Sequence, residues 1–156
     1  MTRSGAEPAP RLVLDTTAYS HLRRGHANVL DLIAHADVII VPVTVLGELE
    51  GAFQAGSRTS ENRRVLSSFL SEPTVTTAPA TTSVARRYGR IYAQLRRDGR
   101  PIPTNDMWIA AAAIDTGGCL LTFDGHFDHV EGLDAIIFRS RTRPRLSEMS
   151  TQRKDG

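Results

Sequence analysis

Short apolar runs alternate with segments of helical periodicity along the chain, and this alternation constrains the fold more than any other feature. The runs at Leu12–Leu14, Val38–Val41 and Cys119–Thr122 have the length and apolar character of buried strands. Two further runs, Thr74–Thr77 and Ala135–Phe138, are expected to form strands as well. Because strands that alternate with helices pair in parallel, the sequence predicts an α/β fold. We expect a mostly parallel central sheet of about five strands, with helices on both faces.

Helix boundaries follow from capping residues, glycines and prolines. Helices are expected over residues 17–24, 28–36, 44–55, 61–70, 83–98 and 106–115. The expected N-terminal caps of the last four helices are, in the same order, Thr44, Ser60, Thr82 or Ser83, and Thr104 or Asn105. At 156 residues the chain fits one domain. Residues 1–10 are expected to be a flexible leader, residues 11–139 the folded domain, and residues 140–156 a mobile arginine-rich tail.

Four acidic residues stand where an apolar element begins or ends, or on its buried face: Asp15, Glu48, Asp106 and Asp124. The carboxyl ends of parallel strands and the adjoining helix starts meet at one crevice, so we expect these acids to lie together. Taken singly, three of them have ordinary roles as turn or cap residues. Glu48 has no such explanation, because it lies three residues after Val45 on the apolar face of its helix.

Four carboxylates in one crevice repel one another. At a separation of ~5 Å and an effective dielectric constant of ~20, each pair costs on the order of 3 kcal/mol. Such a cluster is stable at neutral pH only if some acids are protonated or a cation lies between them. A hard divalent ion is the simpler solution, and oxygen ligands favour Mg²⁺ or Mn²⁺ over zinc.

The remaining reactive residues argue against other chemistries. Cys119 is the only cysteine, which excludes an internal disulfide and fits a reducing, cytoplasmic compartment. Lys154 is the only lysine, so the body of the chain has none for P-loop or Schiff-base chemistry. His126 and His129 follow a glycine turn without a partner pair elsewhere, and His21 is expected on a helix surface. The apolar runs are too short to span a bilayer.

Each of the four acids belongs to a local pattern. Leu12–Thr17 is an apolar strand followed by an acid and two threonines, Pro42–Leu49 opens a helix that bears the second acid, and Asp106–Ala113 begins with the third. Gly117–Phe127 combines an apolar strand with a Thr-x-Asp-x-x-Phe ending. In this order the patterns resemble those of PIN-domain nucleases over residues 11–138, nearly the whole body. In size and motif order the chain is most similar to the small VapC-type toxins.

The resemblance implies a single PIN-like domain with Mg²⁺-dependent endoribonuclease activity, in which Mn²⁺ is an alternative metal. It further implies that the protein is the toxin of a type II toxin–antitoxin pair, hydrolysing RNA phosphodiesters. A cognate antitoxin and a homodimer are implied partners, with no membrane association.

The resemblance also assigns roles within the acidic pocket. Asp15 and Asp106 would be the principal metal ligands, and Glu48 and Asp124 would complete the four-carboxylate site directly or through water. Two hydroxyl residues are candidates for orienting the carboxylates, as in other metal sites: Thr16 and Thr122. Thr122 can equally be an ordinary strand-end threonine.

An acidic pocket repels a polyanionic substrate, so basic residues are needed nearby. Arginines crowd the segment that leads to the third acid: Arg86, Arg87, Arg90, Arg96, Arg97 and Arg100. Among them, the candidates for contacts with RNA phosphates are Arg86, Arg90 and Arg97. A solvated helix face is the alternative interpretation of each.

Two other functions stay open. An aspartate-based phosphotransfer domain fits Asp15 at a strand end, but the chain lacks an acid two residues further on and a lysine in the body. A non-catalytic interaction module with the PIN fold is the second alternative, and the presence of all four acids argues against it.

Overall fold

The computed structural model describes residues 10–139, so the segments expected as leader and tail fall largely outside the described range, on residues 1–9 and 140–156. In chain order the elements are β1 (Arg11–Leu14), α1 (Thr16–Arg23), α2 (Ala27–Ala34), β2 (Val38–Pro42), α3 (Val43–Ala55), α4 (Thr59–Leu70), β3 (Val75–Ala78), α5 (Thr82–Asp98), α6 (Thr104–Thr116), β4 (Cys119–Thr122), a 3₁₀ turn η1 (Gly125–His129) and β5 (Ala135–Ile137). Within residues 10–139, no helix is both long and apolar enough to cross a membrane.

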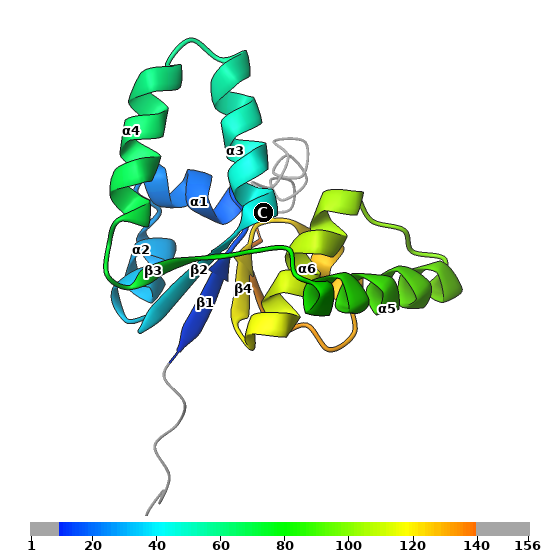
Figure 1. The fold of residues 1–156 in the computed structure, drawn as a ribbon. Helices are drawn as coiled ribbons and strands as arrows, with labels where there is room; N and C mark the ends of the chain where they lie inside the picture. The colour runs from blue at the N-terminus through cyan, green and yellow to red at the C-terminus, as the bar shows by residue number, and fades with distance from the viewer. Residues whose placement is uncertain (1–9, 140–156) are drawn as a thin grey trace, which may run out of the picture.

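The five strands form one parallel sheet in the order β3-β2-β1-β4-β5 (Figure 1). This confirms the predicted fold class. From β1 the chain proceeds outward through β2 and β3, whereas from β4 it proceeds in the opposite direction to β5. The strand order therefore reverses between β1 and β4. In open α/β sheets such a reversal creates a crevice outside the carboxyl ends of the two strands.

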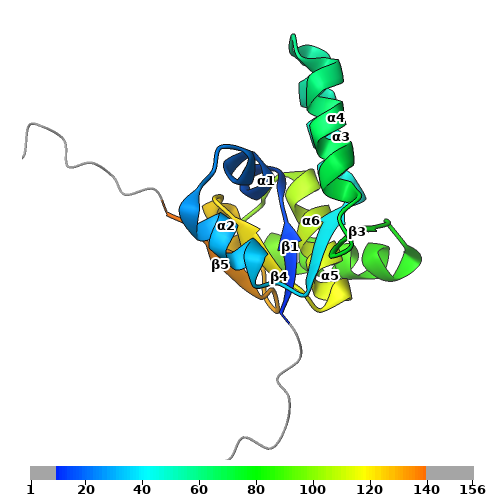
Figure 2. The ribbon, with the colours of Figure 1, turned by 90° about the vertical axis from the view of Figure 1, so that its left-hand side faces the viewer.

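The two faces of the sheet are covered by different helices, as the view in Figure 2 shows. Val13 and Leu120 lie on the face that packs against α3, α5 and α6, whereas Leu12, Leu14 and Leu121 lie on the face that packs against α1 and α2. Strand side chains alternate between faces, so residues two positions apart share a face. This alternation decides to which side the first residues beyond each strand turn.

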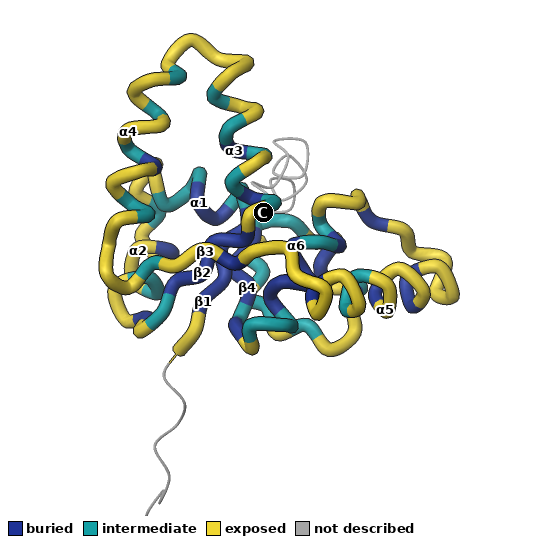
Figure 3. Tube along the Cα trace, viewed as in Figure 1, coloured by how far each residue is buried: buried dark blue, intermediate teal, exposed yellow. Residues whose placement is uncertain are grey.

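A hairpin of α3 and α4 extends beyond the carboxyl edge of the sheet (Figure 1). Its far end is exposed, whereas its base is buried against the sheet (Figure 3). Glu50 and Arg63 form an ion pair between the two helices. Since α3 begins directly after β2, its first two turns lie beside the crevice.

Several helix starts differ from the predicted ones. The helix α3 begins at Val43 and α6 at Thr104, each directly after a proline with extended backbone, and neither has a side-chain cap. Proline fixes φ near the value that this boundary needs, so the expected hydroxyl caps are unnecessary. The other two helices, α4 and α5, begin after Arg58 and Thr81, one or two residues earlier than predicted.

Candidate functional site

The site lies where the sheet order reverses, at the carboxyl ends of β1 and β4. The register pairs Leu14 with Leu121, so the next residues, Asp15 and Thr122, are neighbours. Both are two residues beyond side chains that face α6, and by alternation they turn to that same side. The side chain of Asp15 is 3% exposed and that of Thr122 is fully buried.

Hydrogen bonds from fixed donors hold the carboxylate of Asp15 in place. Its Oδ1 accepts from the Thr17 hydroxyl and from the backbone N–H of Ala18, both at 2.8 Å. Its Oδ2 accepts from the hydroxyl of Thr122 at 2.5 Å. Burial raises the pKa of Asp15, these hydrogen bonds oppose the rise, and the charge of Asp124 adds to it. With both oxygens engaged, Asp15 has a single orientation.

The two threonines after Asp15 have different roles. The hydroxyl of Thr16 donates to Oε1 of Glu48 at 2.9 Å and so links α1 to α3. Thr17, which sequence reasoning did not single out, donates to Asp15 and accepts from the backbone N–H of Phe123 at 3.0 Å. Both hydroxyls therefore fix carboxylates that come from different elements.

Asp106 lies in the first turn of α6, two residues after the helix begins, because α6 starts earlier than predicted. Its pKa is raised from 3.8 to about 6. Burial is the largest cause, followed by the negative charges of Asp124 and Glu48, while His126 opposes the rise and Asp15 adds a further increase. The four acids predicted from the sequence are thus gathered within reach of one another's charge.

The short turn after β4 brings a histidine to this cluster. The backbone N–H of Asp124 donates to the hydroxyl oxygen of Thr122 at 3.0 Å, and Asp124 Oδ1 accepts from the backbone N–H of His126 at 2.9 Å. The ring nitrogen Nδ1 of His126 lies 3.2 Å from Asp124 Oδ1 and 3.7 Å from Asp106 Oδ2. These three side chains offer ligand atoms within 4.8 Å of one another.

The family to which the sequence can be assigned agrees with the geometry of this acidic site. The model of the PIN domain family matches residues 12–133, which run from β1 to the loop before β5. The chain belongs to the PIN domain family. The resemblance read from the order of the acids is therefore confirmed.

Three named proteins show which members of the PIN domain family this chain is similar to. Ribonuclease VapC5 of Mycobacterium tuberculosis (strain ATCC 25618 / H37Rv) is 28% identical to this chain over 124 residues, covering 80% of this chain and 90% of that protein. A structure of VapBC-5 from Mycobacterium tuberculosis, a member of the VapBC family of toxin-antitoxin systems, has a TM-score of 0.61 at 27% identity, covering 83% of this chain and 98% of that one. VapBC2 from Rickettsia felis, bound to a DNA fragment from their promoter, has a TM-score of 0.72 at 24% identity, covering 81% and 98%.

Some residues near the site differ from their expected roles. His21 was expected on a helix surface, but its ring stacks on Phe123 with centroids 3.6 Å apart, and it is half-buried. His126 was expected to have no part in a site, yet it lies against two of the acids. Asn105 lies inside α6 and is exposed.

Proposed function

We propose that this PIN-domain protein is a metal-dependent endoribonuclease that acts as the toxin of a type II toxin–antitoxin pair. The observation that carries the proposal is the gathering of Asp15, Glu48, Asp106 and Asp124 at the reversal point of the sheet, where burial and the neighbouring negative charges raise the pKa of Asp106. The likeness to Ribonuclease VapC5 supports RNA as the substrate.

The donor set fits a hard divalent ion. The pKa of Asp106 is raised by burial and then by the negative charges of Asp124 and Glu48, and a cation between the carboxylates would offset both effects. Carboxylate oxygens favour Mg²⁺ or Mn²⁺. We assign Asp15 and Asp106 as the principal ligands, completed by Glu48 and Asp124. A bound divalent ion would supply Lewis-acid catalysis of phosphodiester hydrolysis.

The neighbouring residues hold these ligands in fixed positions. Thr122 and Thr17 bind both oxygens of Asp15, and Thr16 binds Glu48, so the carboxylates do not have to reorganise when an ion arrives. His126 is about half exposed, and its Nδ1 lies within 4 Å of carboxylate oxygens of Asp106 and Asp124 at the solvent boundary of the cluster. It therefore lies where a substrate phosphate would approach.

The proposed partners rest on the relatives. Structures of VapBC pairs have the same fold, so we propose a cognate antitoxin that binds this chain, a homodimer, and action on RNA in the cytoplasm.

Cleavage of RNA by the purified protein tests the proposal. We expect cleavage in Mg²⁺ or Mn²⁺, and loss of cleavage when EDTA or the cognate antitoxin is added. Asp15→Asn and Asp106→Asn are expected to lower the cleavage rate by more than about a hundredfold, since even residues that only orient metal ligands contribute 10–100-fold. Asp37→Asn, an exposed acid outside the cluster, is the control. Cleavage by both site variants at the wild-type rate would refute the assignment. A titration that detects no divalent metal binding would favour a non-catalytic interaction module instead.

A further inference from the structure

A stripe of arginines follows one side of α5. Arg86, Arg90 and Arg97 are separated by four and seven residues, which places them within about 40° of one another around the helix. They span eleven positions, or about 16 Å along the axis. All three are exposed, and within residues 10–139 none of them forms an ion pair. Arg87 differs, because its Nε binds Asp115 at 2.9 Å.

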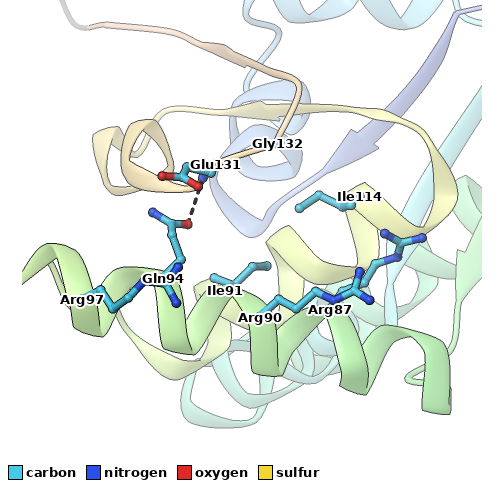
Figure 4. Close-up of a pocket in the computed structure, with 8 residues that line it drawn as sticks. All are labelled: Arg87, Arg90, Ile91, Gln94, Arg97, Ile114, Glu131 and Gly132. Carbon is cyan, nitrogen blue, oxygen red and sulfur yellow. Dashed lines mark hydrogen bonds between the residues drawn. The ribbon is translucent and has the colours of Figure 1, made fainter.

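Two members of the stripe, Arg90 and Arg97, border a groove between α5, the end of α6 and the loop before β5, and Arg87 lines it as well. The groove has a volume of about 260 Å³ and an apolar floor of Ile91 and Ile114. Figure 4 shows Arg87, Arg90 and Arg97 following one another along α5 at its rim. Among its lining residues only Glu131 is acidic, so the rim is positively charged.

The far wall of the groove is fixed by Gln94, which is buried. Its amide donates to the carbonyl of His129 and to Asp98, both at 2.8 Å, and its oxygen accepts from the backbone N–H of Glu131 at 3.0 Å (Figure 4). Gln94 therefore has no free donor for a ligand. It holds the loop after η1 against α5, and the arginines alone remain available.

The stripe leads toward the acidic cluster. α5 runs antiparallel to α6: Arg87 contacts Asp115 near the end of α6, whereas Leu95 lines a cavity with Thr104 and Met107 at its start. Arg97 thus lies toward the end of α6 that bears Asp106. The turn η1, which begins directly after Asp124, is joined to the second half of α5 through His129.

We propose that Arg86, Arg90 and Arg97 bind the sugar-phosphate backbone of the RNA substrate outside the cleavage position. This inference rests on the proposed function. The stripe is about 16 Å long, so it can contact several successive phosphates of a bound strand. The acidic cluster repels a polyanion, and a row of guanidinium groups at a distance supplies the opposing attraction. The row is linear and exposed, as a polymer requires.

Salt-dependent RNA binding in EDTA is the first measurement, made with the full chain. The double variant Arg90→Gln/Arg97→Gln is compared with Arg58→Gln/Arg64→Gln, which removes the same charge from exposed positions in the first half of the hairpin helix α4 and the residue before it. Each lost phosphate contact reduces the magnitude of the slope of log K against log salt by about 0.7, so the slope of the α5 variant should be smaller by about 1.4. If the two proteins bind equally at 1 M salt, this variant binds roughly 25-fold more weakly than the wild type at 0.1 M salt. The control should keep the wild-type slope. Equal slopes for the two variants overturn the proposal.

Cleavage of two RNAs separates this inference from the proposed function. Wild-type protein in Mn²⁺ should prefer, by kcat/KM, a long unstructured RNA over an oligonucleotide too short to reach from the acids to Arg97. The α5 variant should lose this preference, and the control should retain it. If the wild type cleaves RNA without a length preference, the proposed role of the arginine stripe is wrong but the proposed function stands. If the wild type neither binds nor cleaves RNA, both proposals are wrong.

Discussion

Replacing Asp106 with asparagine is expected to stabilise the metal-free protein at neutral pH and to abolish its RNA cleavage. The side chain of Asp106 is 15% exposed and is surrounded by three other acids. In the absence of a cation its charge opposes folding. Asparagine keeps nearly the same shape and removes the charge, and with it the cost of burying that charge and the repulsion from the other acids.

The size of the effect follows from the pKa of Asp106, which is about 6 in the native protein against 3.8 ordinarily. The difference corresponds to about 3 kcal/mol. Because the native state holds the proton more tightly, wild-type stability is highest below the unfolded pKa and falls as pH rises toward 6. The advantage of the variant is therefore absent at low pH, grows between about pH 4 and pH 6, and is constant above.

Thermal unfolding with EDTA at about pH 4 and about pH 7.5 measures this advantage, and 3 kcal/mol corresponds to a rise in Tm of roughly 6–12 °C at the higher pH. Asp37→Asn is the control. Adding Mn²⁺ should raise the Tm of the wild type, because a ligand that binds only the native state stabilises it, and the variant should gain much less. A variant that is less stable than the wild type at pH 7.5, or equally favoured at both pH values, would refute the argument from repulsion.

Three further substitutions test single contacts. Thr122→Val removes the bridging hydroxyl and should lower RNA cleavage about 10–100-fold, whereas Thr122→Ser should retain most activity; equal rates would contradict the role. Gln94→Met leaves two partly buried backbone groups, the carbonyl of His129 and the N–H of Glu131, without their partner and should lower the free energy of unfolding in urea by about 1–3 kcal/mol, and a loss near zero would exclude Gln94 as an anchor. Gly118→Ala places a Cβ 2.6 Å from Val13 and should cost about 1–3 kcal/mol, whereas Gly51→Ala on an exposed helix should stabilise by about 0.5–1 kcal/mol; the reverse order would be inconsistent with this packing.

The three central strands β1, β2 and β4 were predictable because they are largely buried and therefore mostly apolar, whereas the edge strands β3 and β5 are partly exposed. Their observed bounds differ from the predicted ones by one residue at most at either end. The helix starts were less predictable, since a hydroxyl cap is only one way to begin a helix. Pro42 and Pro103 begin α3 and α6 through backbone geometry alone. This makes Asp106 the third residue of α6 rather than the first, and it remains in the first turn, where the helix dipole favours a negative charge.

The contact between Asp15 and Thr122 follows in part from the alternation of strand side chains between the two faces of the sheet. Asp15 stands two residues beyond Val13, and Thr122 two residues beyond Leu120, so the parallel register that pairs these strands brings the carboxylate and hydroxyl together. Sequence alone could not supply that register, because it depends on β4 pairing with β1 rather than with another strand. The chain separation of 107 residues between Asp15 and Thr122 is closed only by the sheet.

The position of His126 had no local signal at all. The segment after Asp124 has neither strand nor helix periodicity, and its path depends on contacts from elsewhere: the Asp124 carboxylate turns the backbone at His126, and Gln94, 35 residues before His129, binds the carbonyl at the end of the turn. The buried side-chain amide of Gln94 on α5 therefore helps to place His126 beside Asp106 and Asp124. For this reason Gln94→Met should disturb the candidate site as well as the stability, lowering the RNA cleavage rate even at temperatures where the variant is fully folded.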